Sequence, residues 1–243
     1  MHKLTFSVLV SLFLFVNVAF ANDTIVNTFK SKNETEKVSY FRNLHKEDKI
    51  KHLQFFDNSF SKLVEENKKN KTKTKKFLFC LALIGQLQEK DILAISDFKA
   101  LLEDDKFNLT KRERMDIYVA MQESYLKLNL YSKVFDCNNQ INSLIKEGVD
   151  YPLWSYNIQS RLYLQLQQYD KAIPQLKSEI SFLLQNKKRD SLIIPSAYND
   201  LGYYYSLVNK NDSAIYFFKK SHQLTLKNKN HIDSISYNSL LLN

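Results

Sequence analysis

The sequence predicts an all-α fold built from antiparallel helix pairs. Only three glycines and three prolines occur among 243 residues, too few turn-forming residues for a β-sandwich or a barrel. Large apolar residues recur every three or four positions through residues 196–227, which is the spacing of one helix face. Tyr-Asn also begins at residues 156, 198 and 237, at intervals of 42 and 39 residues. Self-similarity at such a period is what a helical array requires.

The first 21 residues have the features of a secretory signal peptide. A short basic start is followed by an apolar run and by the small-residue triplet Ala19-Phe20-Ala21, after which cleavage is expected. A retained membrane anchor is the alternative, because residues 4–20 are almost long enough to span a bilayer. We therefore expect export to the periplasm or cell envelope, with N-terminal membrane anchoring as the alternative.

Residues 22–73 are expected to combine a flexible segment with capping helices. Residues 22–36 are polar and are predicted to be flexible, and helical patterns follow at about residues 37–44 and 49–67. These helices carry no clear repeat pattern. We expect them to cover the apolar end of the array, which would otherwise be exposed.

Residues 74–243 are predicted to form the repeat array, with four and a half helix pairs. The copies start near Thr74, Tyr118, Tyr156, Ser196 and Ile235. Ser132 and Asp212 are the expected N-caps of two second helices, because their side-chain oxygens can accept from unpaired first-turn amides. The last copy stops half made at Asn243, so we expect the native chain to continue.

The best-preserved copy, at residues 196–227, resembles the tetratricopeptide repeat (TPR). The resemblance rests on Tyr198, Leu201, Gly202, Tyr205, Ala214 and Phe218. It extends over roughly residues 74–243, and the period of about 40 residues is similar to the longer-helix variety of bacterial signalling and regulatory proteins. It implies a right-handed superhelical solenoid of antiparallel helix pairs.

Basic residues give the chain a formal net charge of +9, or +8 once Lys3 leaves with the signal peptide. Six lysines fall within residues 68–76, and such a run can bind nucleic acid or an anionic membrane. No aromatic residue is interleaved with these lysines, and an exported protein meets little nucleic acid. The favoured interpretation is a solvated loop between helices, without nucleic-acid binding by this segment and with membrane proximity as the alternative.

The sequence contains no recognisable catalytic or metal-binding constellation. It has no glycine-rich phosphate loop, no Gly-x-Ser-x-Gly motif and no Cys-x-x-Cys pair. His45 and His52 lack a carboxylate at ligand spacing and are expected at the surface. Cys80 and Cys137 fall in helices of different copies, where packing is the expected role and a disulfide the alternative. We predict a protein that is not an enzyme and that needs no cofactor or metal.

The TPR resemblance implies a binding groove lined by the first helix of each pair. The residue after the first large residue of the pattern commonly points into this groove, and in three copies it is an asparagine, whose amide can hold a peptide backbone. Helix-surface polarity is the alternative role. Trp154 would either stack on a ligand or be buried under a neighbouring helix. The candidate partner-binding residues are Asn157, Arg161, Asn199, Tyr203, Asn238 and Trp154.

These features predict a non-enzymatic, exported TPR module that binds a protein or peptide. The resemblance implies a role as the extracytoplasmic sensory or docking part of a membrane-bound signalling or transcriptional regulator. The alternative function is a structural or assembly adaptor of the cell envelope, which would bind envelope components through the basic surface of the lysine run.

Overall fold

The computed structural model describes residues 23–44, 46–150, 157–185 and 193–227, and the regular structure in these ranges is entirely helical. The predicted all-α class is therefore confirmed. The chain divides into two compact units, Met1–Leu128 and Asn129–Asn243. None of the helices in the described ranges is long and apolar enough to cross a membrane. The predicted signal peptide and the half copy from residue 235 lie outside these ranges.

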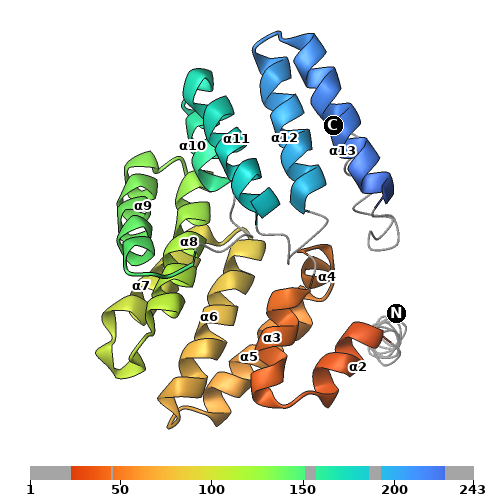
Figure 1. Ribbon diagram of the computed structural model, residues 1–243. Helices are drawn as coiled ribbons and strands as arrows, with labels where there is room; N and C mark the ends of the chain where they lie inside the picture. The colour runs from red at the N-terminus through yellow and green to blue at the C-terminus, as the bar shows by residue number, and fades with distance from the viewer. Residues whose placement is uncertain (1–22, 45, 151–156, 186–192, 228–243) are drawn as a thin grey trace, which may run out of the picture. The chain divides into compact units, whose positions relative to one another are not determined.

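The first unit begins with helices that precede the predicted repeats (Figure 1). They are α2 (Thr24–Ser31), α3 (Glu34–Asn43), α4 (Lys46–Lys51) and α5 (Leu53–Glu66). Helix α2 lies in the segment that was expected to be flexible. Its N-cap is Asp23, whose Oδ1 accepts from the Ile25 amide at 2.9 Å. Val26 and Phe29 are buried, so one face of this short helix belongs to the core.

The core of these N-terminal helices is a cluster of phenylalanine rings. Phe29 from α2, Phe41 from α3, and Phe56 and Phe60 from α5 are at most 2% exposed. Phe41 meets Phe56 and Phe60 edge to face, with ring centroids 5.1 and 5.2 Å apart. Phe29 meets Phe60 in the same manner at 5.6 Å. Edge-to-face packing sets the positive ring edge against the negative face, so the rings fix how these three helices meet.

The first unit continues with three helices of the predicted array. They are α6 (Lys71–Leu87), α7 (Asp91–Glu103) and α8 (Lys111–Lys127), with a short 3₁₀ turn, η1 (Asp105–Phe107), before α8. Helix α6 begins at Lys71 inside the lysine run, three residues before the predicted start at Thr74, so the loop prediction is wrong from residue 71 onward. Asn70 caps α6 by accepting from the Lys73 amide at 3.2 Å, and Thr74 Oγ1 donates to the Asn67 carbonyl at 2.7 Å.

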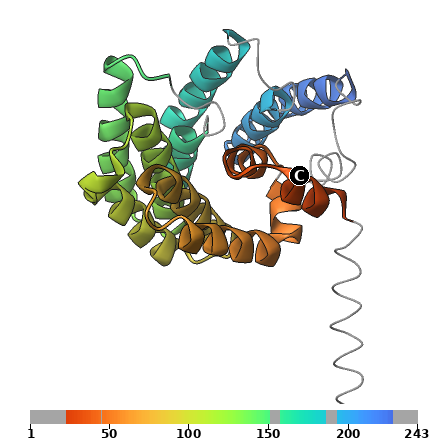
Figure 2. The same ribbon diagram turned by 90° about the horizontal axis from the view of Figure 1, so that it is seen from below.

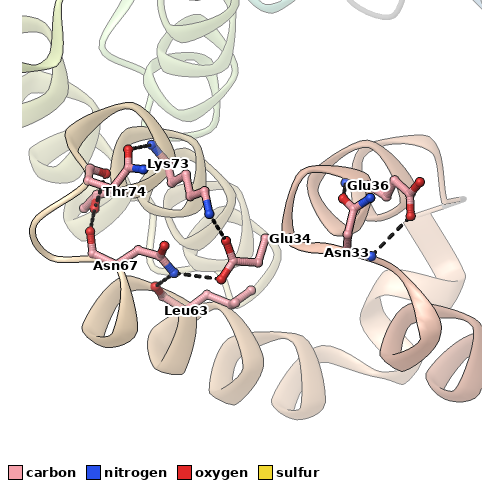
Figure 3. Close-up of polar contacts among 8 residues, drawn as sticks. Asn33, Glu34, Glu36, Leu63, Asn67, Lys73 and Thr74 are labelled. Carbon is pink, nitrogen blue, oxygen red and sulfur yellow. Dashed lines mark hydrogen bonds and ion pairs between the residues drawn. The ribbon is translucent and has the colours of Figure 1, made fainter.

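Two lysines of this run tie α6 to other helices of the first unit. Lys73 Nζ lies 2.6 Å from Glu34 Oε2 of α3, and Figure 3 shows Glu34 reaching both Lys73 and Asn67. Lys75 Nζ lies 2.7 Å from Glu113 Oε2 of α8, and the Lys75 side chain is only 8% exposed. Lys75 therefore has a buried structural role, whereas Lys73, with a side chain that is 44% exposed, makes an ion pair at the surface.

The second unit contains the remaining helices. They are α9 (Tyr131–Lys146), α10 (Ile158–Gln165), α11 (Tyr169–Gln185), α12 (Ile193–Leu207) and α13 (Asn211–Lys227). Both overall views show α12 and α13 side by side as one hairpin (Figures 1 and 2). Tyr198, Leu201 and Tyr205 of α12 are buried with Ala214 of α13 and with apolar residues of α11. The predicted pairing in residues 196–227 is confirmed.

The turns that follow the described helices α6, α8, α10 and α12 have the same backbone form. One residue has a left-handed φ of 56° to 60°, and it is Glu89, Asn129, Gln167 or Asn209. In three of these turns the next amide, that of Lys90, Gln168 or Lys210, donates to the carbonyl five residues earlier at 2.9 to 3.0 Å. This pattern closes the first helix, and the second begins directly after it.

The compact turn explains why two predicted N-caps are wrong. Helix α9 starts at Tyr131 after Leu130, which provides no side-chain cap, so Ser132 lies inside the helix. Helix α13 starts at Asn211, so Asp212 lies within its first turn. A carboxylate at that point still faces the positive end of the helix dipole. The entry angle is set by the left-handed residue, and a polar cap is not required there.

Two glycines that face the second helix of their pair provide a matched test of packing. A Cβ at Gly85 would lie 3.6 Å from Ala94 Cβ, an ordinary contact, whereas a Cβ at Gly202 would lie 2.7 Å from Phe218 Cδ1. We expect Gly85→Ala to raise the free energy of unfolding by about 0.5–1 kcal/mol, because alanine favours helix. We expect Gly202→Ala to lower it by about 1–3 kcal/mol through overpacking.

Urea unfolding followed by far-UV circular dichroism measures both changes. Adding Phe218→Leu to Gly202→Ala should recover part of the loss, because the smaller side chain relieves the clash. If Gly202→Ala stabilises the protein as much as Gly85→Ala does, the close approach of Gly202 to Phe218 is not real.

Candidate partner-binding surface

Helix α12 presents a stripe of side chains that do not take part in its core. Asn199, Tyr203 and Leu207 follow one another at intervals of four residues, so they share one helix face. Tyr203 is 46% exposed and Leu207 is 39% exposed, whereas Asn199 is half-buried. Among the described residues, none makes a hydrogen bond to the side-chain amide of Asn199. The stripe therefore offers an amide, an aromatic ring and an apolar side chain to a partner.

Helix α10 repeats this spacing one copy earlier. Asn157 precedes its first turn, Arg161 is half-buried on the helix and Gln165 is exposed at its end. These positions lie 42 residues before Asn199, Tyr203 and Leu207. The predicted residues Asn157 and Arg161 therefore occupy the same register as Asn199 and Tyr203.

A hydrogen bond connects the two helices. Asn157 Nδ2 donates to Asp200 Oδ2 at 3.1 Å. The Asn157 amide, predicted to hold a ligand, is thus engaged with α12 and helps to position the two helices. No role for Asp200 was predicted from the sequence. Its position directly after Asn199, which occupies the same repeat register as Asn157, was the available sign that it could accept a hydrogen bond from a neighbouring helix. The amide ladder stays a prediction, and Asn238 and Trp154 lie outside the described residues.

A group of polar side chains lies between α10, α11 and α12, and the sequence did not reveal it. Ser160 Oγ donates to Glu179 Oε2 at 2.8 Å, and Gln175 Nε2 donates to Glu179 Oε1 at 3.1 Å. Burial raises the pKa of the Glu179 carboxyl to about 7 in spite of these bonds, and the nearby Asp200 carboxylate adds to the rise. Burial also raises the pKa of the Tyr204 hydroxyl.

Other residues that suggested chemistry have structural roles. His52 is 2% exposed, so the surface prediction is wrong, and its Nε2 lies 3.2 Å from Asp23 Oδ2 at the start of α2. Cys80 and Cys137 are both buried and do not form a disulfide. Within the part of the chain that the structure describes, no three His, Cys, Asp or Glu side chains come together to hold a metal ion.

Comparisons with known proteins give the fold. Neither models of protein families nor curated proteins match the sequence. BtubC from P. vanneervenii has a TM-score of 0.59 at 12% identity, over 88% of this chain and 95% of that one. The TPR-like repeats of a putative kinesin light chain from Podosopora anserina have a TM-score of 0.54 at 12% identity, over 77% of this chain and 94% of that one. The chain has a TPR-like repeat fold. The predicted fold class is thereby confirmed.

A third TPR-like neighbour was solved with a ligand. It is a Rap protein complexed with Competence and Sporulation Factor, and it has a TM-score of 0.57 at 14% identity, over 88% of this chain and 67% of that one. At these identities the likeness concerns the fold.

Proposed function

We propose that this TPR-like chain is a non-enzymatic module that binds an extended polypeptide along the stripe of Asn199, Tyr203 and Leu207. The observation that carries the proposal is the exposure of Tyr203, 46%, at the centre of the stripe. A half-exposed tyrosine supplies apolar area and a polar tip at small entropic cost, which is why tyrosine is enriched among residues that dominate binding.

The chemistry of the stripe favours a polypeptide over a small polar ligand. The Asn199 amide offers a donor and an acceptor, which matches the alternation along a peptide backbone. Tyr203 and Leu207 offer contact to apolar side chains of the same peptide. Support also comes from the Rap neighbour, which was solved in complex with Competence and Sporulation Factor.

The proposed place of action is outside the cytoplasm, as the sensory or docking part of a membrane-bound regulator. The support for export is the basic start, the apolar run and the Ala19-Phe20-Ala21 triplet. The alternative, an envelope adaptor that binds through the lysine run, has less support. Lys73 and Lys75 make internal ion pairs, so they contribute little free positive charge to a surface.

A photo-crosslinking experiment tests the proposed surface. A photoreactive amino acid at position 203 should capture a polypeptide partner from envelope extract, whereas the same group at position 216 should not. Tyr216 is a matched control, because it is a tyrosine of the same unit that is 58% exposed on a second helix, α13.

Capture at position 203 should fall when Asn199 and Leu207 are changed to alanine. These half-buried and exposed positions tolerate truncation, typically within about 0.5 kcal/mol of stability. Equal capture at positions 203 and 216, or capture at position 216 alone, would assign the partner to another face of the unit.

A further inference from the structure

The first unit contains a pocket between α3, α6 and α8. Its volume is about 180 Å³, and Val38, Phe79 and Ile117 give it an apolar wall. An apolar cavity of about 150 Å³ accepts a benzene ring, so this pocket has room for one ring or a short branched chain. Arg42 and Lys76 also line it, and an occupant would therefore meet both apolar surface and positive charge.

The acidic residues around the pocket are already neutralised. Asp116 Oδ2 lies 2.7 Å from Arg42 Nη2, and Asp116 Oδ1 lies 3.2 Å from Arg112 Nε. Glu113 Oε2 lies 2.7 Å from Lys75 Nζ, which also donates to the Asn108 carbonyl at 3.2 Å. Since both carboxylates have cationic partners, the pocket has little attraction for a metal ion or an amine.

Lys76 differs from the other charged residues of the pocket. It is half-buried, and among the described residues its ammonium group has no ion pair. Because Lys76 lines the pocket without an ion pair, a carboxylate bound there can make a charge-assisted hydrogen bond to its ammonium group. Arg42 supports such a site, because its side chain is 37% exposed and only one of its five N–H groups is needed for the bond to Asp116.

We propose that this pocket binds an amphipathic carboxylate, whose apolar group of about one ring lies on Phe79 and Ile117 and whose carboxylate pairs with Lys76. Lys75, the other lysine of the pocket, is already paired with Glu113, so a second ligand carboxylate would find no unpaired lysine and a monoanion fits better than a dianion. The site belongs to the first unit and does not depend on the proposed polypeptide surface of the second.

The test uses the full chain and two probes of the same shape, phenylacetate and its neutral amide, phenylacetamide. Binding is followed by amide chemical-shift changes in NMR titrations at millimolar probe concentrations. We expect the unaltered protein to prefer the acid by about tenfold, since a charge-assisted contact contributes more than a neutral one. The shifts should map to α3, α6 and α8.

A pair of lysine variants separates the pocket from general charge attraction. Lys76→Met keeps side-chain length but removes the cation, so the preference for the acid should disappear. Lys69→Met removes an exposed lysine of the same run and should leave the preference unchanged. The proposal is overturned if the unaltered protein binds neither probe, if it binds both equally, or if Lys76→Met retains the preference.

The carboxylate that binds this pocket can belong to a free acid or to the C-terminal residue of a peptide. N-acetylphenylalanine, which resembles a peptide's C-terminal residue, distinguishes these two sources when it is compared with phenylacetate. Tighter binding of N-acetylphenylalanine than of phenylacetate would assign the site to peptide ends, and the reverse would assign it to free acids. Both results retain the shared chemistry of a ring and one carboxylate.

Discussion

Replacing Phe60 with alanine is expected to lower the free energy of unfolding of the first unit by about 3–5 kcal/mol. Phe60 is 0% exposed at the centre of the phenylalanine cluster. Its ring contacts those of Phe29, Phe41 and Phe77, at centroid distances from 5.2 to 6.3 Å. Truncation removes these contacts and leaves a cavity that rings on three other helices cannot all move to fill.

Urea unfolding of the full chain, followed by far-UV circular dichroism, measures this loss. Phe135→Ala is the matched control, because Phe135 is a helical phenylalanine that is 39% exposed, and its truncation should change stability by less than about 0.5 kcal/mol. A loss of less than about 1 kcal/mol for Phe60→Ala would mean that the cluster is loosely packed or that the cavity collapses.

The helix pairs of the array were predictable because they depend on local periodicity. Apolar spacing in residues 196–227 placed α12 and α13 correctly, and the same reasoning placed α6 and α7. Each of these helices buries one face against a helix that directly follows or precedes it in the chain. Such local amphipathic patterns are visible in the sequence without knowledge of the rest of the fold.

The lysine run was misjudged because its partners are distant in the sequence. Lys73 bonds Glu34, 39 residues earlier, and Lys75 bonds Glu113, 38 residues later. Six lysines in nine positions repel one another in isolation, which favours a solvated loop. The acidic side chains of α3 and α8 compensate two of these charges, and α6 then begins at Lys71.

The shared turn escaped prediction because its left-handed residue is never glycine. Glu89, Asn129, Gln167 and Asn209 fill that position, and of these three residue types only asparagine adopts the left-handed region readily. The sequence therefore indicates polar N-caps at Ser132 and Asp212 in place of this turn. The helix hairpin imposes the conformation at Glu89 and Gln167, and a local pattern contains no trace of it.

The candidate surface was only partly predictable. Register along one helix placed Asn199 and Tyr203 on a common face, and Tyr203 is exposed there. The bond from Asn157 to Asp200 spans 43 residues, and the environment of Glu179 depends on three helices. Such contacts follow from tertiary packing, so neither the engaged state of Asn157 nor the raised pKa of Glu179 could be read from spacing.

The pH dependence of stability should show the burial of Glu179 directly. Its carboxyl has a folded-state pKa of about 7 against an ordinary value of 4.5, so the folded protein favours the protonated form. The part of the folding stability that depends on a protonated Glu179 is fully present below pH 4.5 and is lost as the pH rises through 7. The two pKa values differ by about 2.5, and at about 1.4 kcal/mol for each pKa unit the loss for the second unit is about 3.5 kcal/mol.

Glu179→Gln removes this titration and keeps a similar shape. Between about pH 5 and pH 8, the free energy of unfolding of the variant should vary by about 2 kcal/mol less than that of the unaltered protein. Asp170→Asn, at an exposed position in the first turn of the same helix, should keep the original slope. Identical pH profiles for the unaltered protein and Glu179→Gln would place the Glu179 carboxylate in contact with solvent. The polar group between α10, α11 and α12 would then be open to water.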